Sequence, residues 1–259
     1  MPRYKLTIEY EGTRYSGWQV QKNARTVQGE LIGAAKTVFN REDFELMGSG
    51  RTDAGVHAMA QVAHLDVQTM LAPHIIRMKM NDLLPADVHV LEVEKAGPRF
   101  HARHDAEARS YLYHISTRRS AFAKRFVWWV KDRLDVAAME RTADLFEGMH
   151  DFASFTRDDP REKSTQVLVE SMRVIPHGSL ILVHITASHF LWNMVRQLVG
   201  TLVEVGRGNV QSSTVQQWLR TRDESSRQFT ASPSGLFLER VYYKGDKRNP
   251  DIRPIIEIR

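Results

Sequence analysis

Short segments in which apolar and polar residues alternate recur along the chain, and helix-like segments separate them. In the first half, this alternation predicts strands over 3–10, near 44–48, over 60–67 and over 88–96. Apolar residues at helical spacing predict helices over 26–39 and 73–84. Thr26 is a suitable N-cap for the first helix, and Pro73 suits the first turn of the second.

The second half shows a similar mixture. Its β-rich segments predict strands over 108–116, 126–130, 165–175, 180–188 and 235–243. Its helix-like segments predict helices over 135–148 (with Asp135 as the cap), 190–205 and 211–220. Pro176, His177 and Gly178 separate two of the strands, which favours a hairpin. The chain is therefore expected to be an α+β protein of two halves whose sheets are shared or adjoining.

A boundary between the halves is expected near residues 97–105. Gly97 and Pro98 follow the last strand pattern of the first half, and basic residues become frequent beyond them. We therefore assign residues 1–103 to an N-terminal α+β domain and residues 104–259 to a C-terminal one. No low-complexity linker separates them, which predicts a rigid junction. A cleft between two such halves is a usual place for a functional site.

The composition excludes several classes of chemistry. The absence of cysteine removes disulfides, thiolate chemistry and cysteine-based zinc sites. Neither an N-terminal apolar signal segment nor an apolar run of membrane-spanning length occurs. Hydrophobic residues make up 42% and charged residues 26% of the chain, an ordinary globular balance. We expect a folded cytoplasmic protein without a membrane partner.

Positive charge is concentrated in residues 99–125. This basic stripe holds seven Lys or Arg and two acids, so its net charge of +5 equals that of the whole chain. A local basic stripe is typical of a protein that binds a polyanion, although a solvated charged face would look the same. Tyr111 and Tyr113 lie within the stripe and favour nucleic acid, because aromatic rings can stack on unpaired bases.

Asp53 lies in the glycine-rich stretch GSGRTDAGVHA, residues 48–58. Asp followed two residues later by Gly is a turn signature, so Asp53 has a purely structural interpretation, which the local sequence alone favours. The alternative is that the turn presents the carboxylate. A carboxylate can act as a covalent nucleophile at an anomeric carbon, as it does in glycosidases.

The helix predicted over 190–205 carries an apolar stripe that is expected to face the core. The side away from this stripe holds Asn193, Arg196, Gln197 and Gly200. Gly200 lies one turn from Arg196 and leaves room for a neighbouring backbone or a ligand to approach. Arg196 is either a surface arginine or the charge partner of a carboxylate.

Other common chemistries have no motif in this chain. There is no H-E-x-x-H motif, no Walker P-loop and no G-x-G-x-x-G fingerprint, and spacing does not assemble a Ser-His-Asp triad. His101 and His104 lie three residues apart in a segment that is not predicted to be helical, which does not favour a metal site. A lone carboxylate, a basic stripe with tyrosines and an arginine on a helix remain.

A series of motifs spans nearly the whole chain. They are YEGTRYSGWQVQ (10–21), TVQGEL (26–31), GRTDAGVHA (50–58), RFHAR (99–103), RSYLY (109–113), HDFASF (150–155), NMVRQLVGTLVEVG (193–206) and GLFL (235–238). In these motifs and their order, the chain resembles the TruA-type tRNA pseudouridine synthases. So many motifs in one order make the resemblance specific.

The resemblance implies an isomerase that converts uridine to pseudouridine in the anticodon stem-loop of tRNA, at positions 38, 39 and 40. It implies that the enzyme uses no cofactor and no metal, and that it works as a homodimer. It also implies two α+β halves with ferredoxin-like mixed or antiparallel sheets and helices on one side. Together these halves would make a pseudouridine synthase fold with a basic cleft between them that receives RNA.

By the same resemblance, Asp53 is the nucleophile, which attacks either C1′ of the ribose or C6 of the uracil. Four further residues contact the substrate or the nucleophile: Arg51 in base flipping, Tyr111 stacked on the target base, Arg196 paired with the nucleophile, and Leu236 under the base. Ser232 stands where the family has a proline, and we expect it to loosen that loop without shifting the register of Leu236.

Two alternatives to an isomerase remain. One is an RNA-binding module of the same fold that has lost catalysis, although binding alone does not need the carboxylate of Asp53. The other is a metal-dependent nuclease or phosphatase, which lacks the further acids that Mg²⁺ would require near Asp53.

Overall fold

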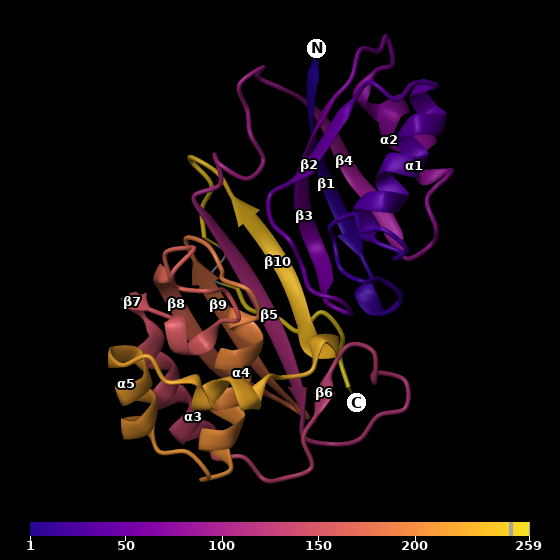
Figure 1. Ribbon diagram of the computed structural model, residues 1–259. Coiled ribbons are helices and arrows are strands. Elements are labelled where there is room, and N and C mark those ends of the chain that lie inside the picture. The colour runs from indigo at the N-terminus through magenta and orange to yellow at the C-terminus, as the bar shows by residue number, and fades with distance from the viewer. Residues whose placement is uncertain (249–250, 259) are drawn as a thin grey trace. The chain divides into compact units, whose positions relative to one another are not determined.

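The computed structural model describes residues 1–248 and 251–258 and consists of two compact units (Figure 1). The first unit contains residues 1–107 and 237–247, and the second contains residues 108–236, 248 and 251–258. Both units contain strands, and the α+β class predicted from the sequence is confirmed. The division into folding domains at residues 103 and 104 stays a prediction.

The sheet of the first unit has the strand order β4–β1–β3–β10. β1 (Arg3–Tyr10) lies antiparallel between β3 (His57–Asp66) and β4 (Val88–Ala96). The other edge of β3 pairs with two strands in succession. β10 (Leu236–Tyr242) runs parallel beside the beginning of β3, and β2 (Glu45–Gly48) runs antiparallel beside its end.

Two helices complete the first unit, and they lie side by side in Figure 1. α1 (Val27–Phe39) begins after Thr26, whose hydroxyl accepts the Gly29 N–H, so the predicted N-cap is confirmed. α2 (Pro73–Asn81) has the proline in its first turn and ends three residues before the predicted end. The core of the unit is apolar and is formed by residues such as Leu6, Ile8, Leu31, Leu65 and Ile76.

The sheet of the second unit has the order β5–β9–β8–β7 and is antiparallel. Its strands are β5 (Ala108–Ser116), β7 (Gly148–Asp151), β8 (Gln166–His177) and β9 (Leu180–Ala187), and the short β6 (Trp128–Trp129) pairs parallel with β5. The predicted hairpin is present as β8 and β9, and its turn contains Gly178 at φ +58°.

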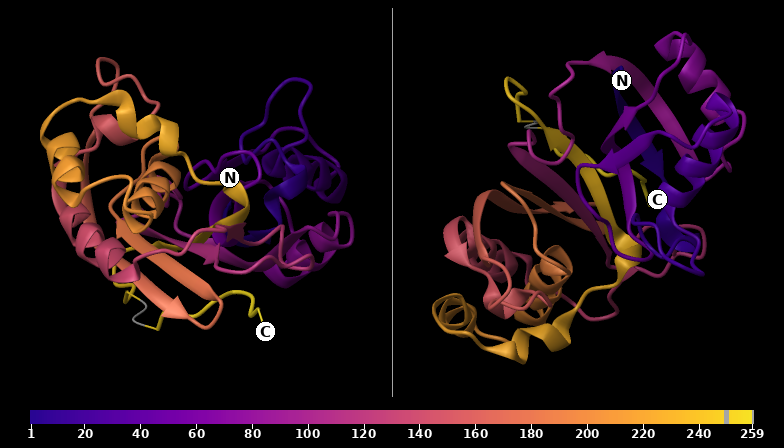
Figure 2. Two further views of the ribbon diagram at one scale, coloured as in Figure 1. Left: turned by 90° about the horizontal axis from the view of Figure 1, so that it is seen from below. Right: turned by 45° about the horizontal axis from the view of Figure 1, so that its top comes forward.

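Helices pack on the sheet of the second unit (Figure 2). The helices are α3 (Val136–Ala143), α4 (Met194–Gly206) and α5 (Ser212–Arg220). Because side chains alternate along β5, Tyr111 and Tyr113 lie on the opposite face from Leu112. A cluster that includes Leu112 and Leu182 is packed against partly buried isoleucines of residues 252–258. The face of the sheet that carries Leu112 is therefore covered by an apolar layer that includes residues from the C-terminal part of the chain.

Short 3₁₀ turns connect several elements. They are η1 (Gly12–Arg14), η2 (Asp144–Phe146), η3 (Ala153–Phe155), η4 (Glu224–Phe229) and η5 (Pro233–Gly235). The helix predicted over 135–148 is α3 followed by η2, and its Asp135 cap accepts the Ala138 N–H. In the part of the chain that the structure describes, no helix is long and apolar enough to cross a membrane.

The prediction for residues 190–205 is wrong in two respects. α4 begins only at Met194, because Asn193 adopts a left-handed backbone conformation with φ +62°. The side that was expected to face away from the core is also largely buried, since Gln197 and Gly200 are inaccessible to solvent or nearly so. Residues 229–231 cover this side, and the carbonyl of Phe229 lies where a side chain at Gly200 would be.

We predict opposite effects for two Gly→Ala substitutions within helices. A Cβ added at Gly200 would lie 1.4 Å from the Phe229 carbonyl oxygen, so Gly200→Ala should lower the free energy of unfolding. Such overpacking costs about 1–3 kcal/mol or more. Gly33 in α1 has no atom within 4 Å of an added Cβ, so Gly33→Ala should raise stability, by about 0.5–1 kcal/mol. Urea unfolding measures both, and equal effects would contradict the close packing at Gly200.

Candidate active site

Asp53 lies in the loop between β2 and β3, in the first unit. The loop closes with a hydrogen bond of 3.2 Å from the Val56 N–H to the Asp53 carbonyl, and Gly55 has φ +79°. The turn predicted from the sequence is therefore present. Asp53 is half-buried, Thr52 before it is buried, and Arg51 is exposed.

The end of β1 and the segment that follows it hold the Asp53 loop in place through hydrogen bonds. The Tyr10 hydroxyl and Thr52 Oγ1 share a buried hydrogen bond of 2.7 Å, and the Trp18 N–H donates to the Thr52 carbonyl at 3.1 Å. Burial raises the pKa of Tyr10 well above its ordinary value, so the hydroxyl keeps its proton. The Gly55 N–H donates to the Tyr15 carbonyl at 3.3 Å. The backbone is thus tied down on both sides of Asp53.

Two glycines allow this close contact. Gly17 has φ +89°, and a Cβ on it would lie 2.5 Å from the Thr52 carbonyl oxygen. A Cβ on Gly12 would lie 2.0 Å from the Val56 carbonyl oxygen. Neither position has room for any side chain. The motif at residues 10–21, which sequence reasoning used only for the resemblance, therefore has a physical purpose in shaping the Asp53 loop.

Buried polar side chains brace the two ends of the loop. Ser49 Oγ donates to Gln61 Oε1 at 2.7 Å, and Gln61 Nε2 donates to the Gly50 carbonyl at 3.1 Å. At the other end, the Gly12 N–H donates to His57 Nδ1 at 3.0 Å. Sequence reasoning missed Ser49, Gln61 and His57. Ser49 and His57 lie inside the stretch 48–58 that holds Asp53, and Gln61 is a polar residue within the strand 57–66.

The second unit contains Tyr111, Arg196 and Leu236. Tyr111 is half-buried on β5, and its ring meets the ring of Phe190 edge to face, with centroids 4.9 Å apart and an interplanar angle of 85°. This geometry is a favourable one for aromatic pairs and fixes the plane of the tyrosine ring. Phe190 lies in the segment just before α4 and was not singled out from the sequence.

Arg196 is held by the segment that crosses its helix. Its Nε donates to the Ala231 carbonyl at 2.8 Å, and its Nη1 donates to Asn193 Oδ1 at 2.9 Å. In return the Ala231 N–H donates to the Arg196 carbonyl at 3.0 Å. The bare backbone at Gly200 lets this segment approach the helix. The room that was predicted beside Gly200 is therefore filled by the backbone of a neighbouring segment.

A second tyrosine holds the loop that leads to Leu236. Tyr113 is fully buried, and its hydroxyl donates to the Ser232 carbonyl at 2.6 Å. Its ring packs against Gly235, where a Cβ would lie 2.7 Å away. Ser232 Oγ also lies 2.9 Å from Ser234 Oγ. These contacts hold the loop around Ser232, where the sequence departs from the family pattern, and Leu236 is buried at the start of β10.

The five predicted residues therefore fall into two groups. Asp53 and Arg51 share one loop of the first unit. Within the second unit, Tyr111, Arg196 and Leu236 belong to segments that are joined through Phe190, Ala231 and Tyr113. The pairing of Arg196 with Asp53, and the roles of all five residues toward a substrate, stay predictions.

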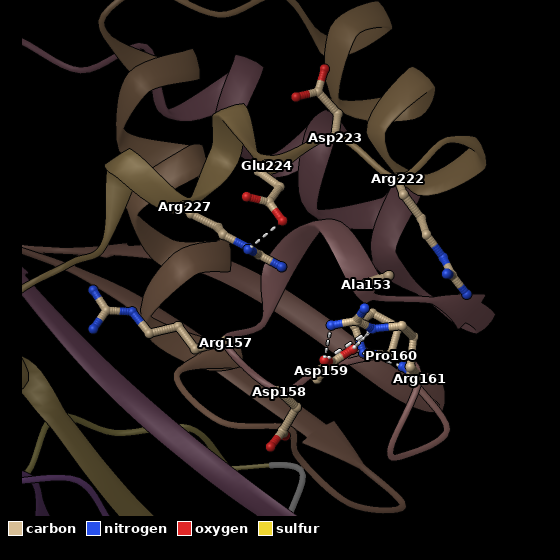
Figure 3. A pocket seen from close by; sticks show the side chains of 10 residues that line it. All are labelled: Ala153, Arg157, Asp158, Asp159, Pro160, Arg161, Arg222, Asp223, Glu224 and Arg227. Carbon is tan, nitrogen blue, oxygen red and sulfur yellow. Dashed lines mark hydrogen bonds and ion pairs between the residues drawn. The ribbon is translucent and has the colours of Figure 1, made fainter.

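None of these five residues lines the cavity of about 390 Å³ in the second unit (Figure 3). That cavity is charged and is lined by Ala153, Arg157, Asp158, Asp159, Pro160, Arg161, Arg222, Asp223, Glu224 and Arg227. Among residues 1–248 and 251–258, no group of three or more His, Asp or Glu is arranged to hold a metal ion. The charged cavity is therefore separate from the five predicted site residues.

Comparison with known proteins identifies the family. The family model described as tRNA pseudouridine synthase matches residues 6–105 and 142–244. These ranges include Asp53, Arg196 and Leu236, whereas Tyr111 falls between them. The chain belongs to the tRNA pseudouridine synthase family, which is a family of enzymes.

Individual relatives match along almost the whole chain. The tRNA pseudouridine synthase A of Brucella ovis is 42% identical over 248 residues, which cover 94% of this chain and 98% of the relative. The protein of the same name from Brucella canis matches with the same identity and coverage. A solved Cbf5-Nop10-Gar1 complex is a distant structural match, with a TM-score of 0.33 and 11% identity over 77% of this chain and 54% of that chain.

We predict that Gly17→Ala disturbs the Asp53 loop more than it disturbs the fold. The added Cβ would overlap the Thr52 carbonyl, and φ +89° is strained for alanine. The loop must shift, and a displacement of about 1 Å can cost on the order of 100-fold in rate. Activity on tRNA and a thermal unfolding curve should be measured for the same preparation, with Gly33→Ala as the control. Wild-type activity in Gly17→Ala would show that the contact does not position Asp53.

Proposed function

We propose that this chain converts uridine to pseudouridine in the anticodon stem-loop of tRNA, at positions 38, 39 and 40, with Asp53 as the nucleophile and without a cofactor. The observation that carries this proposal is the match to tRNA pseudouridine synthases along 94% of the chain. The rigid loop around Asp53 supports it, because a nucleophile needs a fixed position.

The reaction is a balanced rearrangement of one nucleotide. The bond between N1 of uracil and C1′ of ribose breaks, and a bond between C5 and C1′ forms. C5 loses a proton and N1 gains one, so no oxidant, reductant or second substrate is needed. Asp53 attacks either C1′ or C6 to release the base, and both routes return the carboxylate unchanged.

The base must leave the stack before it reacts, at a cost of a few kcal/mol. Arg51 is exposed on the Asp53 loop and can assist this flipping by entering the space that the base vacates. Phosphate contacts made by the basic stripe over 99–125 would supply binding energy, which makes the affinity dependent on salt.

Tyr111 and Leu236 would hold the free uracil during its rotation. A tyrosine ring and an apolar side chain contact the faces of a base without fixing its rotation in the plane. The edge-to-face contact with Phe190 keeps the Tyr111 ring oriented for this stacking. Arg196 would pair with the Asp53 carboxylate and stabilise its negative charge.

The same proposal includes a cytoplasmic location and a homodimer, as the resemblance implies. An RNA-binding module that has lost catalysis would bind tRNA but would not need a fixed carboxylate. The two proposals therefore differ in whether Asp53 is required for turnover.

We predict that Asp53→Asn abolishes tritium release from tRNA that carries C5-labelled uridine, while tRNA binding is largely kept. The amide has a similar shape but is not a nucleophile, so only the chemical step should be lost. Asp43→Asn, an exposed residue of the same unit that pairs with Arg41, is the matched control and should turn over normally. Equal release by Asp53→Asn and wild type would remove Asp53 from the mechanism. If wild type releases no tritium from any tRNA, the binding module is supported instead.

We predict that Tyr111→Phe keeps most of the turnover, whereas Tyr111→Ala loses it. Phenylalanine preserves the ring that stacks on the base and meets Phe190, and alanine removes both contacts. Base stacking on an aromatic side chain is worth about 1–3 kcal/mol. Single-turnover rates with saturating tRNA would measure the effect. Wild-type rates in Tyr111→Ala would show that stacking is not its role.

A further inference from the structure

Trp192 is an exposed aromatic residue on a fixed backbone. Its exposed fraction is 54%, while Leu191 and Asn193 on either side are buried. The Trp192 N–H donates to Asp158 Oδ2 at 2.9 Å. Its carbonyl accepts from the Arg157 N–H and from Thr156 Oγ1, both at 3.1 Å. The ring is therefore presented to solvent from a backbone that is tied to residues 156–158.

The carboxylate in this backbone clamp is charged at neutral pH. Burial would raise the pKa of Asp158, but the hydrogen bond from the Trp192 N–H and the contact with Lys163 at 3.0 Å outweigh it. The resulting pKa lies below the ordinary value. The stability that comes from this carboxylate is present above its ordinary pKa and is lost only as the pH falls through the lowered one.

Arg157 lies next to the clamp and also lines the charged cavity of the second unit. It is exposed, and no hydrogen bond or ion pair of its guanidinium occurs among the residues that the structure describes. Figure 3 shows this guanidinium directed away from the acids that line the same cavity. Two of those acids are already neutralised, since Asp159 pairs with Arg161 and Glu224 pairs with Arg227. Arg157 is thus available for an anion.

The position of Trp192 relates it to the candidate active site within the second unit. Phe190, two residues earlier, packs on Tyr111, and Asn193, the next residue, accepts a hydrogen bond from Arg196. The segment 190–193 therefore touches two of the predicted site residues and exposes one aromatic ring to solvent.

We propose that Trp192 and Arg157 form an additional RNA contact, in which the indole stacks on an unpaired base of the substrate loop and the guanidinium binds an adjacent phosphate. This inference rests on the proposed function, which supplies the RNA. Aromatic rings beside basic side chains are suited to unpaired nucleotides, because every base has a stacking face and a phosphate beside it. A second protein chain is less suited to this surface, since protein interfaces bury about 800 Å² per partner and the residues adjoining Trp192 in sequence are buried or half-buried.

The test compares four variants with the whole wild-type enzyme: Trp192→Ala, Trp192→Phe, Arg157→Gln and, as the control, Met149→Ala. Met149 is 62% exposed on β7 and has no assigned role. Fluorescence-labelled anticodon stem-loop RNA is titrated at several salt concentrations, and kcat and KM are measured by tritium release. Thermal unfolding shows whether each variant is folded.

Trp192→Ala should raise the Kd and the KM about tenfold, within the range for the loss of one base stack, and leave kcat unchanged. Trp192→Phe should stay close to wild type because a ring remains. Arg157→Gln should weaken binding and reduce the slope of log Kd against log salt by about 0.7–0.9, as expected for one phosphate contact. Trp192→Ala should leave that slope unchanged, and Met149→Ala should change neither quantity.

Wild-type affinity in Trp192→Ala would overturn the inference. A change in sedimentation without a change in RNA affinity would also overturn it, because it would place Trp192 in a contact between protein chains. An equal loss in Trp192→Phe and Trp192→Ala would do the same, since stacking would then not be the cause. If the wild type binds RNA in a Trp192-dependent way but releases no tritium, the contact stands and the proposed isomerase function fails.

Discussion

The contact between residues 10–18 and the backbone around Thr52 is the interaction on which the rest of the candidate site depends. A nucleophile on a loop is useful only if the loop keeps its place to within about half an ångström. Here the Tyr10 hydroxyl and the Trp18 N–H grip Thr52, and Gly17 lets the two backbones touch. Because these bonds are buried, water does not compete for them. The position of Asp53 is therefore set by a segment that contains none of the proposed chemical groups.

A close backbone approach at a glycine also positions a proposed functional residue in the second unit. Gly200 removes the side chain that would keep residues 229–231 away from α4, and the Phe229 carbonyl occupies the space. Arg196 then binds the crossing segment through both its backbone and its guanidinium. In each unit a proposed functional residue is placed by backbone contact at a glycine. Such contacts are stiffer than contacts between flexible side chains, because fewer torsions can relax them.

Local patterns in the sequence predicted most of the elements, and the failures have a common physical origin. The strands at 88–96 and 108–116 and the Thr26 cap are found where they were predicted. The helix containing Arg196 was predicted to begin too early because a single left-handed residue, Asn193, is not visible in an apolar periodicity. The burial of Gly200 depends on Phe229, about thirty residues away in sequence, which periodicity does not report. The motifs indicated the candidate site residues, but the supports at Gly17, Gln61 and Phe190 required the structure.

The pairing of β10 with β3 has a consequence for how the protein is made. Phe237 and Leu238 lie beside His57 and Ala58, so residues 180 positions apart along the chain complete one sheet. A ribosome adds about 5–20 residues per second, so the beginning of β3 waits on the order of 10–40 s for its partner strand. During that time one edge of the strand that follows the Asp53 loop is exposed. An unpaired edge favours association with other chains, so the nascent first unit carries this risk until β10 has been synthesised.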